Sequence, residues 1–353
     1  MKILFLEFTN DWSWGLVVNK LIDTLGDLDI SNRMYQDKNN FDDYDIILSQ
    51  QITGMRDIPE KRWRMTICRL GGNKTFDNKE IRFQEEMASV YAIIATNKKL
   101  YEIAKQYNPR TYLIPNGIDL EVWKPNKKAG RRPFIVGFAG NITGDTYRDY
   151  KGYDYVEQAC KELGVELGTA LYGDKQIPHE EMMDEFYYTI SCLVLPTKGE
   201  GSSNVIMESL ACGVPVITTR EAGFHGEMLK DGKNVLFCER SVESVKKCIE
   251  RLRNDRLLRS RMGKAGREFA EKYHDVREIA KQYRHIFEEC YAYNKRTEAE
   301  VKEESNTIMK VRMKKSVYDN GFLEKDIVVK MDLHRIKQLG NEFVEVIGDV
   351  SEG

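Results

Sequence analysis

Residues 200–217 read EGSSNVIMESLACGVPVI and follow a short apolar run of the kind found in buried strands. Two carboxylates, Glu200 and Glu208, stand eight positions apart in this stretch. Glu200 falls in a polar loop, whereas Glu208 lies about one turn inside a segment of helical period that ends at Gly213. Residues 214–218 are typical of a further strand. The stretch therefore predicts a strand–loop–helix–strand unit with acidic groups at the mouth of its loop.

The loop before the predicted helix combines features that favour an anionic, hydroxyl-rich ligand. Gly201 allows a tight turn, and Ser202 or Ser203 is a good N-cap for the helix. The N–H groups and the dipole at a helix start favour phosphate, while the two glutamates can accept hydrogen bonds from sugar hydroxyls. The alternative is that both glutamates are ordinary solvated charges.

This stretch resembles the E-x7-E signature of the retaining glycosyltransferases of family 4, which have the GT-B fold. It matches the variant form E-G-x-P-N-V-x-x-E-A-x-A-C-G-x-P-V-I except at Ser203, which replaces Pro, and at Ser209, which replaces the common Ala. A second stretch, IPNGIDLEVWKP at 114–125, looks like the family's I-x-N-G-[IV]-D-x-x-x-F-x-P. Two long signatures in the right order argue against a chance resemblance.

The composition of the chain sets bounds on its class. Its 353 residues suffice for two domains, and 41% hydrophobic with 31% charged residues is ordinary for a globular protein. A net charge of −2 argues against a protein that coats nucleic acid. Residues 1–8 follow a strand pattern instead of a signal peptide, and no apolar run approaches the ~20 residues of a membrane span. We therefore expect a cytoplasmic protein without a transmembrane segment, with peripheral contact at the inner face of the membrane as an open option.

The spacing of cysteine and histidine predicts neither disulfides nor a metal site. The seven cysteines lack C-x-x-C spacing and mostly stand in apolar segments, which is typical of reduced, buried thiols. The five histidines, at 179, 225, 274, 285 and 334, have no metal-ligand spacing. The resemblance adds that the co-substrate is a nucleoside-diphosphate sugar, with no metal and no cofactor.

Strand-like and helix-like runs alternate along most of the chain, which predicts parallel sheets covered by helices. A polar, basic segment bounded by prolines at 125–133 reads as an exposed linker. The resemblance covers roughly residues 1–293 and implies an α/β GT-B fold, with two Rossmann-like βαβ domains that face a central cleft. The expected parts are an acceptor-side domain at 1–127, a nucleotide-sugar-binding domain at 133–275, a helix at 276–293 that braces the first lobe, and an appendage at 294–353.

The appendage begins with a charged, hydrophilic stretch and then partly alternates apolar and polar residues at 308–313 and 326–334. These runs predict short strands, and Asp319-Asn320-Gly321 is a turn signal between them. We expect a small module that packs on the enzyme or on a second copy of the chain, which would give a homo-oligomer. A disordered tail is the alternative, and no function is assigned to the module.

The resemblance implies that basic side chains and helix N-termini, instead of a metal, stabilise the leaving diphosphate. Family members carry G-R followed some residues later by K-G, and Lys151-Gly152 matches the second element. Asn141 stands where the arginine is expected, so Arg148 is a candidate for the missing charge. Glu200, Lys151 and Arg148 are therefore the catalytic candidates. The alternative for Lys151 is a surface lysine at a helix start, where a cation is slightly unfavourable.

The same resemblance assigns the donor-binding groups. Glu200 would hold hydroxyls of the donor sugar, Glu208 would hold the ribose hydroxyls, and backbone N–H groups would hold the diphosphate together with Lys151. Gly15 follows the first expected strand, where the family commonly has a glycine-containing loop that lets the phosphates approach the first lobe. The donor-binding candidates are Glu208, Gly15, Ser203, Asn204, Val205 and Asn141.

Three residues of the first lobe are candidates for the acceptor side of the cleft. Trp12 and Trp14 stand in a polar loop, where aromatic faces can stack on sugars or bases, although packing against a helix at 16–25 fits equally well. Arg69 ends an expected strand and could bind acceptor or phosphate. Farther along, residues 222–227 resemble the family's G-G-x-x-E turn, which would shape the nucleotide pocket.

By resemblance, the reaction is transfer of a hexose from a UDP- or GDP-linked sugar to a hydroxyl acceptor with retention of anomeric configuration. A donor phosphate oxygen would take the acceptor proton, so no enzymic base is required. The default acceptor is a saccharide or a glycolipid in surface polysaccharide synthesis. Glycosylation of a nucleic-acid base or of a protein, and a catalytically silent GT-B scaffold or binding protein, are the alternatives.

Overall fold

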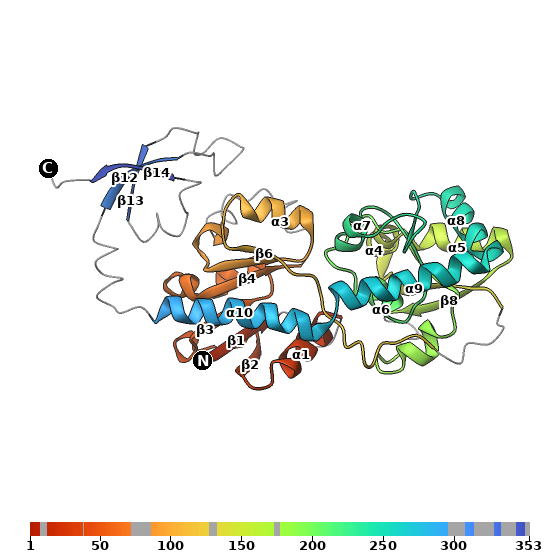
Figure 1. The fold of residues 1–353 in the computed structure, drawn as a ribbon, viewed down its shortest axis with the longest axis horizontal. Coiled ribbons are helices and arrows are strands. Elements are labelled where there is room, and N and C mark those ends of the chain that lie inside the picture. Colours follow the sequence, from red (N-terminus) through yellow and green to blue (C-terminus); the bar gives the residue numbers. More distant parts are fainter. Residues whose placement is uncertain are drawn as a thin grey trace.

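The computed structural model shows two α/β lobes that follow each other along the long axis of the molecule, with a small antiparallel sheet at one end (Figure 1). It describes residues 1–7, 13–37, 39–71, 86–126, 133–172 and 177–295, and the backbone of three strands at 308–313, 328–332 and 344–349.

The first lobe is built on a six-stranded parallel sheet with the order β2-β1-β3-β4-β5-β6. Its strands are β1 (Lys2–Glu7), β2 (Asp29–Met34), β3 (Ile46–Ser49), β4 (Thr66–Leu70), β5 (Ala92–Ala95) and β6 (Thr111–Leu113). The other described elements of this lobe are helices α1 (Ser13–Thr24) and α3 (Lys98–Lys105) and the 3-10 turns Phe41–Asp43, Ile52–Asp57 and Glu60–Met65.

The apolar sequence of β1 explains why this sheet is covered on both faces. Leu4 and Leu6 belong to one apolar cluster, whereas Ile3 and Phe5 belong to another, and all four side chains are fully buried. Successive side chains of a strand point to opposite faces, so a strand that is apolar throughout needs cover on both sides. The second cluster includes Phe287 of α10 (Val276–Asn294), which places this late helix against the first lobe.

The second lobe is built on a five-stranded parallel sheet with the order β11-β10-β9-β7-β8. Its strands are β7 (Ile135–Gly140), β8 (Glu166–Leu171), β9 (Cys192–Leu195), β10 (Val216–Thr218) and β11 (Leu236–Phe237). Its helices are α4 (Gly144–Lys151), α5 (Tyr153–Leu163), α6 (Asn204–Ala211), α7 (Phe224–Met228), α8 (Val242–Asn254) and α9 (Arg256–Tyr273), with a π-helical turn at Met183–Tyr187.

Both lobes share the strand order 2-1-3-4-5 when each is counted from its own first strand, and the first lobe adds a sixth strand at the end of this order. In such doubly wound sheets, ligands bind beyond the carboxyl ends of the strands, at the point where the order reverses. This switch point lies between β1 and β3 in the first lobe and between β7 and β9 in the second. The two Rossmann-like domains expected from the sequence are therefore confirmed.

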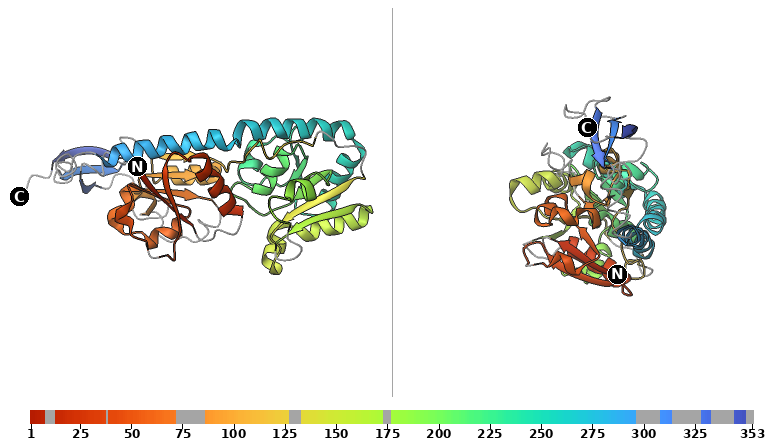
Figure 2. Two further views of the ribbon diagram at one scale, coloured as in Figure 1. Left: turned by 90° about the horizontal axis from the view of Figure 1, so that it is seen from below. Right: turned by 90° about the vertical axis from the view of Figure 1, so that its left-hand side faces the viewer.

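The chain crosses between the lobes twice, and the two crossings pair with each other. The N–H of Ile118 donates to the carbonyl of His274 at 2.7 Å, and the N–H of Val276 donates to the carbonyl of Ile118 at 3.0 Å. Before this point α9 packs on the second lobe, and after it α10 packs on the first (Figure 2). The helix expected at 276–293 thus lies against the first lobe.

Several elements have no counterpart in the sequence prediction, among them β2 and α4. β2 reads DISNRM and forms the edge of its sheet, where none of its residues is fully buried. α4 occupies much of the segment 140–152, where the sequence suggests candidate diphosphate-binding residues but no helix, and it has no buried residue. Hydrophobic periodicity cannot detect elements that bury little apolar surface.

The three described strands beyond residue 295 form an antiparallel sheet in the order β13-β12-β14. β12 (Ile308–Met313) and β13 (Val328–Asp332) fall where the sequence predicts strands, whereas β14 (Val344–Asp349) was not predicted. The turn predicted at 319–321 lies outside the described residues.

Candidate active site

The switch point of the second lobe brings Lys151 and Glu200 into contact. Glu200 stands in the loop between β9 and α6, and Lys151 is the last residue of α4. Lys151 Nζ lies 2.5 Å from Glu200 Oε1, and the two side chains are only 20% and 14% exposed. A short charge-assisted hydrogen bond between partly buried groups is strong and fixes both side chains.

Lys151 is the last residue of α4 and directly precedes Gly152, the N-cap of α5, so it also stands next to the helix start considered in the sequence. Gly152 ends α4 with a φ of +72°, in the left-handed region that favours glycine. A Cβ at this position would also come 2.5 Å from the carbonyl oxygen of Pro196. Lys151 therefore stands at the negative end of the α4 dipole, which favours a cation, and next to the positive end of the α5 dipole, which disfavours one.

Glu208, the second glutamate of the motif, lies inside α6 and is held by two groups that the sequence does not indicate. Its side chain is 8% exposed. Tyr187 donates its hydroxyl to Glu208 Oε2 at 2.7 Å, and His179 Nε2 lies 3.1 Å from Oε1. Burial raises the pKa of Tyr187, so the phenol keeps its proton and remains a donor.

His179 carries a second contact in addition to Glu208. Burial alone would lower the pKa of His179, but the hydrogen bond and charge of Glu208 raise it above its ordinary value. Its ring also lies 5.1 Å from that of Trp123, the aromatic residue of the 114–125 motif. His179 therefore joins the two sequence motifs through one side chain.

The start of α6 is arranged to accept an anion. Ser203 is the N-cap residue, but its hydroxyl makes no capping hydrogen bond. Instead, the hydroxyl of the preceding Ser202 accepts from the N–H of Asn116 at 3.3 Å. The first turn of a helix carries N–H groups without helical partners and the positive end of the dipole, so it suits a phosphate.

A cavity of about 420 Å³ collects these groups. It is lined by Gly140 of β7, by Ala170 of β8, by Tyr172 just after β8, and by the start of α6. The sequence candidates that line it are Asn141, Lys151, Glu200, Ser203, Asn204, Val205 and Glu208. The volume and the mixed polar and apolar lining suit a small ligand with several charged or hydroxyl groups.

A second cavity, of about 390 Å³, lies on the other side of Glu208. It shares Leu16, His179, Asn204 and Glu208 with the first cavity, and it extends between α1 and Trp123. Because α1 belongs to the first lobe and α6 to the second, the two cavities together form a cleft between the lobes.

The lobes touch at one edge of this cleft. A Cβ on Gly201 would come 1.8 Å from the carbonyl oxygen of Gly71, so only glycine fits where the two loops meet. The side chain of Asn97, the N-cap of α3, donates to the carbonyls of Glu200 and Gly201 at 3.3 Å. The carboxylate of Glu227 accepts from two backbone N–H groups at the start of α3.

Two residues of the 140–152 segment take different positions. Asn141 lines the first cavity, and its Oδ1 accepts from the N–H of Thr143 at 2.8 Å. Arg148 is not among the residues that line that cavity. It pairs with Asp154 at 2.5 Å and with Glu157 at 3.1 Å, and it packs over the ring of Tyr153. Its role at the diphosphate stays a prediction.

The first-lobe candidates are only partly brought to the cleft. Gly15 is buried in the first turn of α1, next to Leu16, which lines both cavities. Trp12 lies outside the described residues, and only the backbone of Trp14 is described, in α1. Arg69 is 4% exposed and does not line either large cavity.

Sequence reasoning missed Tyr187, His179 and the hydrogen bonds of Asn116. Tyr187 and His179 stand outside both motifs, and only the folded chain brings them to Glu208. Asn116 belongs to the second motif, and its direct contact with the first motif could have been suspected from the pairing of the two signatures.

Two kinds of feature are absent from the described part of the chain. Among those residues, no group of three or more His, Cys, Asp or Glu side chains could hold a metal ion. No helix within the same ranges is long and apolar enough to cross a membrane.

Comparison with known proteins finds one family model and two partial relatives. The family model described as glycosyl transferases group 1 matches residues 120–269. An uncharacterized glycosyltransferase of Methanocaldococcus jannaschii is 36% identical over 186 residues, which cover 46% of this chain and 50% of that protein. The capsular polysaccharide biosynthesis glycosyltransferase CapM of Staphylococcus aureus is 33% identical over 95 residues, 27% of this chain and 25% of CapM. The chain therefore spans half or less of the length of these curated relatives.

A solved structure matches nearly the whole two-lobed part. The Anabaena protein HepE, crystallised with UDP and glucose, superposes with a TM-score of 0.65 over 82% of this chain and 99% of HepE, at 14% identity. At this identity the likeness establishes the fold alone. The chain has the GT-B fold, and the similarity to the group 1 glycosyltransferases is confined to its residues 120–269 in the family model.

Proposed function

We propose that the protein is a retaining glycosyltransferase that moves a hexose from a UDP- or GDP-linked donor to a hydroxyl acceptor. One observation carries the proposal: the Lys151–Glu200 pair, with Nζ and Oε1 2.5 Å apart, lines a cavity of about 420 Å³ beside the start of α6. The cation and the helix N-terminus suit the diphosphate of a sugar nucleotide, and the carboxylate suits the hydroxyls of its sugar.

In this proposal the diphosphate lies between Lys151 and the first turn of α6. An ammonium group has three N–H donors, so Lys151 can keep its bond to Glu200 while it binds a phosphate oxygen. Glu200 then accepts hydrogen bonds from the donor sugar, and Glu208 accepts from the ribose hydroxyls. Tyr187 and His179 hold Glu208 in place for this task.

The reaction breaks the bond between the sugar C1 and the diphosphate oxygen and forms a bond between C1 and the acceptor oxygen on the same face. A phosphate oxygen of the leaving group takes the acceptor proton, so the residues at the cavity bind and orient but do not act as a base. Lys151 and the helix dipole stabilise the charge that grows on the diphosphate, and no metal is needed for this.

The acceptor we propose is a saccharide or a lipid-linked saccharide. The family match and the partial similarity to CapM support this choice, because CapM is a glycosyltransferase of capsular polysaccharide biosynthesis. The second cavity, between α1 and Trp123, gives the acceptor a place next to the donor.

The test is release of UDP or GDP from a panel of nucleotide hexoses, with thermal unfolding in the presence of each donor as a binding readout. Glu200→Gln should lose about 10²–10³-fold in turnover, because it removes the charge that orients both Lys151 and the sugar. Glu243→Gln, an exposed substitution on α8, is the matched control and should behave as wild type.

A folded wild-type protein that neither releases nucleotide nor is stabilised by any of these donors would overturn the proposal and favour a silent scaffold. Two further readouts test its finer parts. Activity that survives EDTA supports metal independence, and the anomeric configuration of the product, measured by NMR, decides between retention and inversion.

A further inference from the structure

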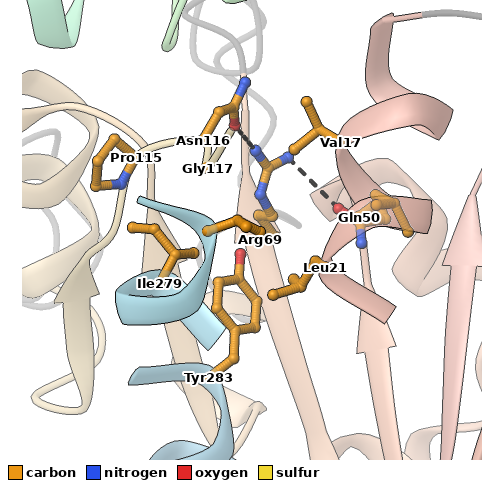
Figure 3. A pocket seen from close by; sticks show the side chains of 11 residues that line it. Val17, Leu21, Gln50, Arg69, Pro115, Asn116, Gly117, Ile279 and Tyr283 are labelled. Carbon is orange, nitrogen blue, oxygen red and sulfur yellow. Dashed lines mark hydrogen bonds between the residues drawn. The ribbon is translucent and has the colours of Figure 1, made fainter. Parts of the chain in front are cut away.

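Arg69 is the penultimate residue of β4 inside the first lobe, close to the switch point of that sheet, and its charge is buried. The side chain is 4% exposed and points toward the crossing between the lobes, as Figure 3 shows. Its guanidinium donates to Asn116 Oδ1 and, at 3.4 Å, to Gln50 Oε1. A small cavity of about 20 Å³ beside it has room for about one water molecule.

Asn116 passes this contact on to the second lobe. Its Nδ2 donates to the carbonyl of Ser202 at 2.9 Å and to Asn204 Oδ1 at 2.6 Å. Its backbone N–H donates to the hydroxyl of Ser202 at 3.3 Å. All of these acceptors lie in the turn that starts α6, between Glu200 and Glu208, which is the turn assigned above to the diphosphate.

The chemistry of the two side chains leaves one orientation for the Asn116 amide. A guanidinium only donates hydrogen bonds, so the amide must turn its oxygen toward Arg69. The amide nitrogen then faces the Ser202 carbonyl and Asn204 Oδ1, both of which only accept. A flipped amide would set N–H against N–H on one side and oxygen against oxygen on the other.

A buried arginine is a poor choice for stability alone. Taking a guanidinium out of water costs several kcal/mol, and apolar residues of similar volume often stabilise a core as well or better. The buried carboxyl of Glu7 lies near this charge: burial raises its pKa above the ordinary value, while the hydrogen bond from Asn32 and the charge of Arg69 act in the opposite direction. The orientation of Asn116 is what the charge adds to the fold.

We propose that Arg69 is a positioning residue, which through Asn116 holds the Ser202–Asn204 turn in the shape that binds the donor diphosphate. This inference rests on the proposed function and deepens it, because it couples the first lobe to a donor site built almost entirely from the second. It replaces direct contact of Arg69 with acceptor or phosphate by an indirect role.

The test is isothermal titration of UDP and of GDP into wild type and Arg69→Met. The variant should bind the preferred nucleotide ~10-fold more weakly, because a hydrogen bond to a charged group is lost and the amide is no longer fixed. Arg62→Met is the matched control: Arg62 is also a buried arginine of the first lobe, and it donates to the carbonyl of Tyr44. Its nucleotide affinity should equal that of wild type even where its melting temperature falls.

The hydrogen bonds from Arg69 to Asn116, and from Asn116 to Ser202 and Asn204, together form what we call the relay. Asn116→Asp tests its two parts separately. The carboxylate keeps the pair with Arg69 but places an oxygen against the Ser202 carbonyl and Asn204 Oδ1, so affinity should fall at least as far as in Arg69→Met. The double variant should bind no more weakly than the weaker single variant, because both act through one amide. Arg69→Lys, which keeps the charge without the fork, should recover part of the affinity and serves if Arg69→Met fails to fold.

The outcomes distinguish the two claims. Unchanged affinity in a folded Arg69→Met or Arg69→Lys, with wild type binding nucleotide, would overturn the relay and leave the proposed function intact. Additive losses in the double variant would overturn it as well. Wild type that binds neither UDP nor GDP would overturn both, since the turn would then hold no donor.

Discussion

The two lobes share a strand order but use their switch points in opposite ways. In the second lobe, the loops after β7 and β9 leave Lys151 and Glu200 partly exposed around a cavity of about 420 Å³. In the first lobe, Arg69 lies near the ends of β1 and β3, buried around a space of about 20 Å³. The same topology thus provides a binding site in one lobe and a buried polar connection in the other, which shows that the fold alone does not assign function.

We expect the largest effect from removing the positive charge of Lys151 at the switch point of the second lobe. Lys151→Met should lower kcat by about 10²-fold, because the charge that forms on the diphosphate loses its nearest positive group. Steady-state release of nucleotide measures this effect. Lys198→Met is the control, since Lys198 pairs with Asp149 on the surface and does not line the cavity.

Combining Lys151→Met with Glu200→Gln sharpens the same point. The two side chains touch, so their effects on turnover should be less than additive. If the loss of turnover in the double variant equals the product of the two single losses, Lys151 and Glu200 do not act as a unit. The second lobe would then lack the paired site that distinguishes it from the first.

Low pH should destabilise the buried polar residues next to Asn116, because two of them are histidines. His274 Nδ1 lies 2.7 Å from the carbonyl of Asn116 and must donate to it, so its Nε2 accepts from His225 Nε2 at 3.1 Å. His225 Nδ1 is then a buried acceptor that has no hydrogen-bond partner within the described residues. Burial lowers the pKa of His274 to about 4, although its bond to Asn116 acts in the opposite direction, and burial together with the charge of His274 lowers that of His225.

These lowered pKa values predict that stability falls as pH drops from about 6.5 to 4. In that window the unfolded chain binds protons that the folded chain excludes, so protonation of the unfolded state at His274 alone costs up to about 3 kcal/mol of stability. Urea unfolding at several pH values measures the slope. His225→Phe removes one of the two titrating rings and should flatten it, whereas His285→Phe, an exposed histidine on α10, should leave it unchanged. Equal slopes in all three proteins would contradict the assignment.

The difference between the switch points of the two lobes also explains which site residues could be predicted from the sequence. Lys151, Glu200 and Glu208 stand in local motifs, and their types match a sugar diphosphate without knowledge of the fold. The partners of Glu208 could not be found in this way, because Tyr187, in the π-helical turn, and His179, in the segment before that turn, reach Glu208 only in the folded chain.

Arg69 and α4 show two other limits. A charged residue at the end of an apolar strand suggests a ligand, but burial of its guanidinium against Asn116 depends on the second lobe and on α10. α4 buries no residue, so its sequence has no periodic apolar signal, and the end of a helix at Lys151 was not foreseen. The two parallel, helix-covered sheets follow from buried apolar strands, which are the strongest signal in the chain, whereas the strand order within each sheet comes from the structure alone.

The smallest expected effect concerns the exposed link between the lobes. Glu227 Oε2 and Oε1 accept from the N–H groups of Lys98 and Lys99 at 2.6 and 3.1 Å, so a carboxylate of the second lobe caps a helix of the first. Glu227→Gln keeps one acceptor but loses the charge that favours the helix dipole, and should cost less than about 1 kcal/mol of stability.

Hydrogen exchange at the start of α3 is the sensitive readout for this link. Exchange at Lys98 and Lys99 should quicken in Glu227→Gln, while nucleotide affinity stays within about twofold of wild type, since the donor turn is held separately through Asn116. Glu102→Gln, farther along the same helix, serves as the control. A loss of affinity as large as that in Arg69→Met would show that the exposed contact between Glu227 and α3 shapes the donor site. The buried hydrogen bonds of Arg69 and Asn116 would then have no separate role, and the contrast between the two lobes would be wrong.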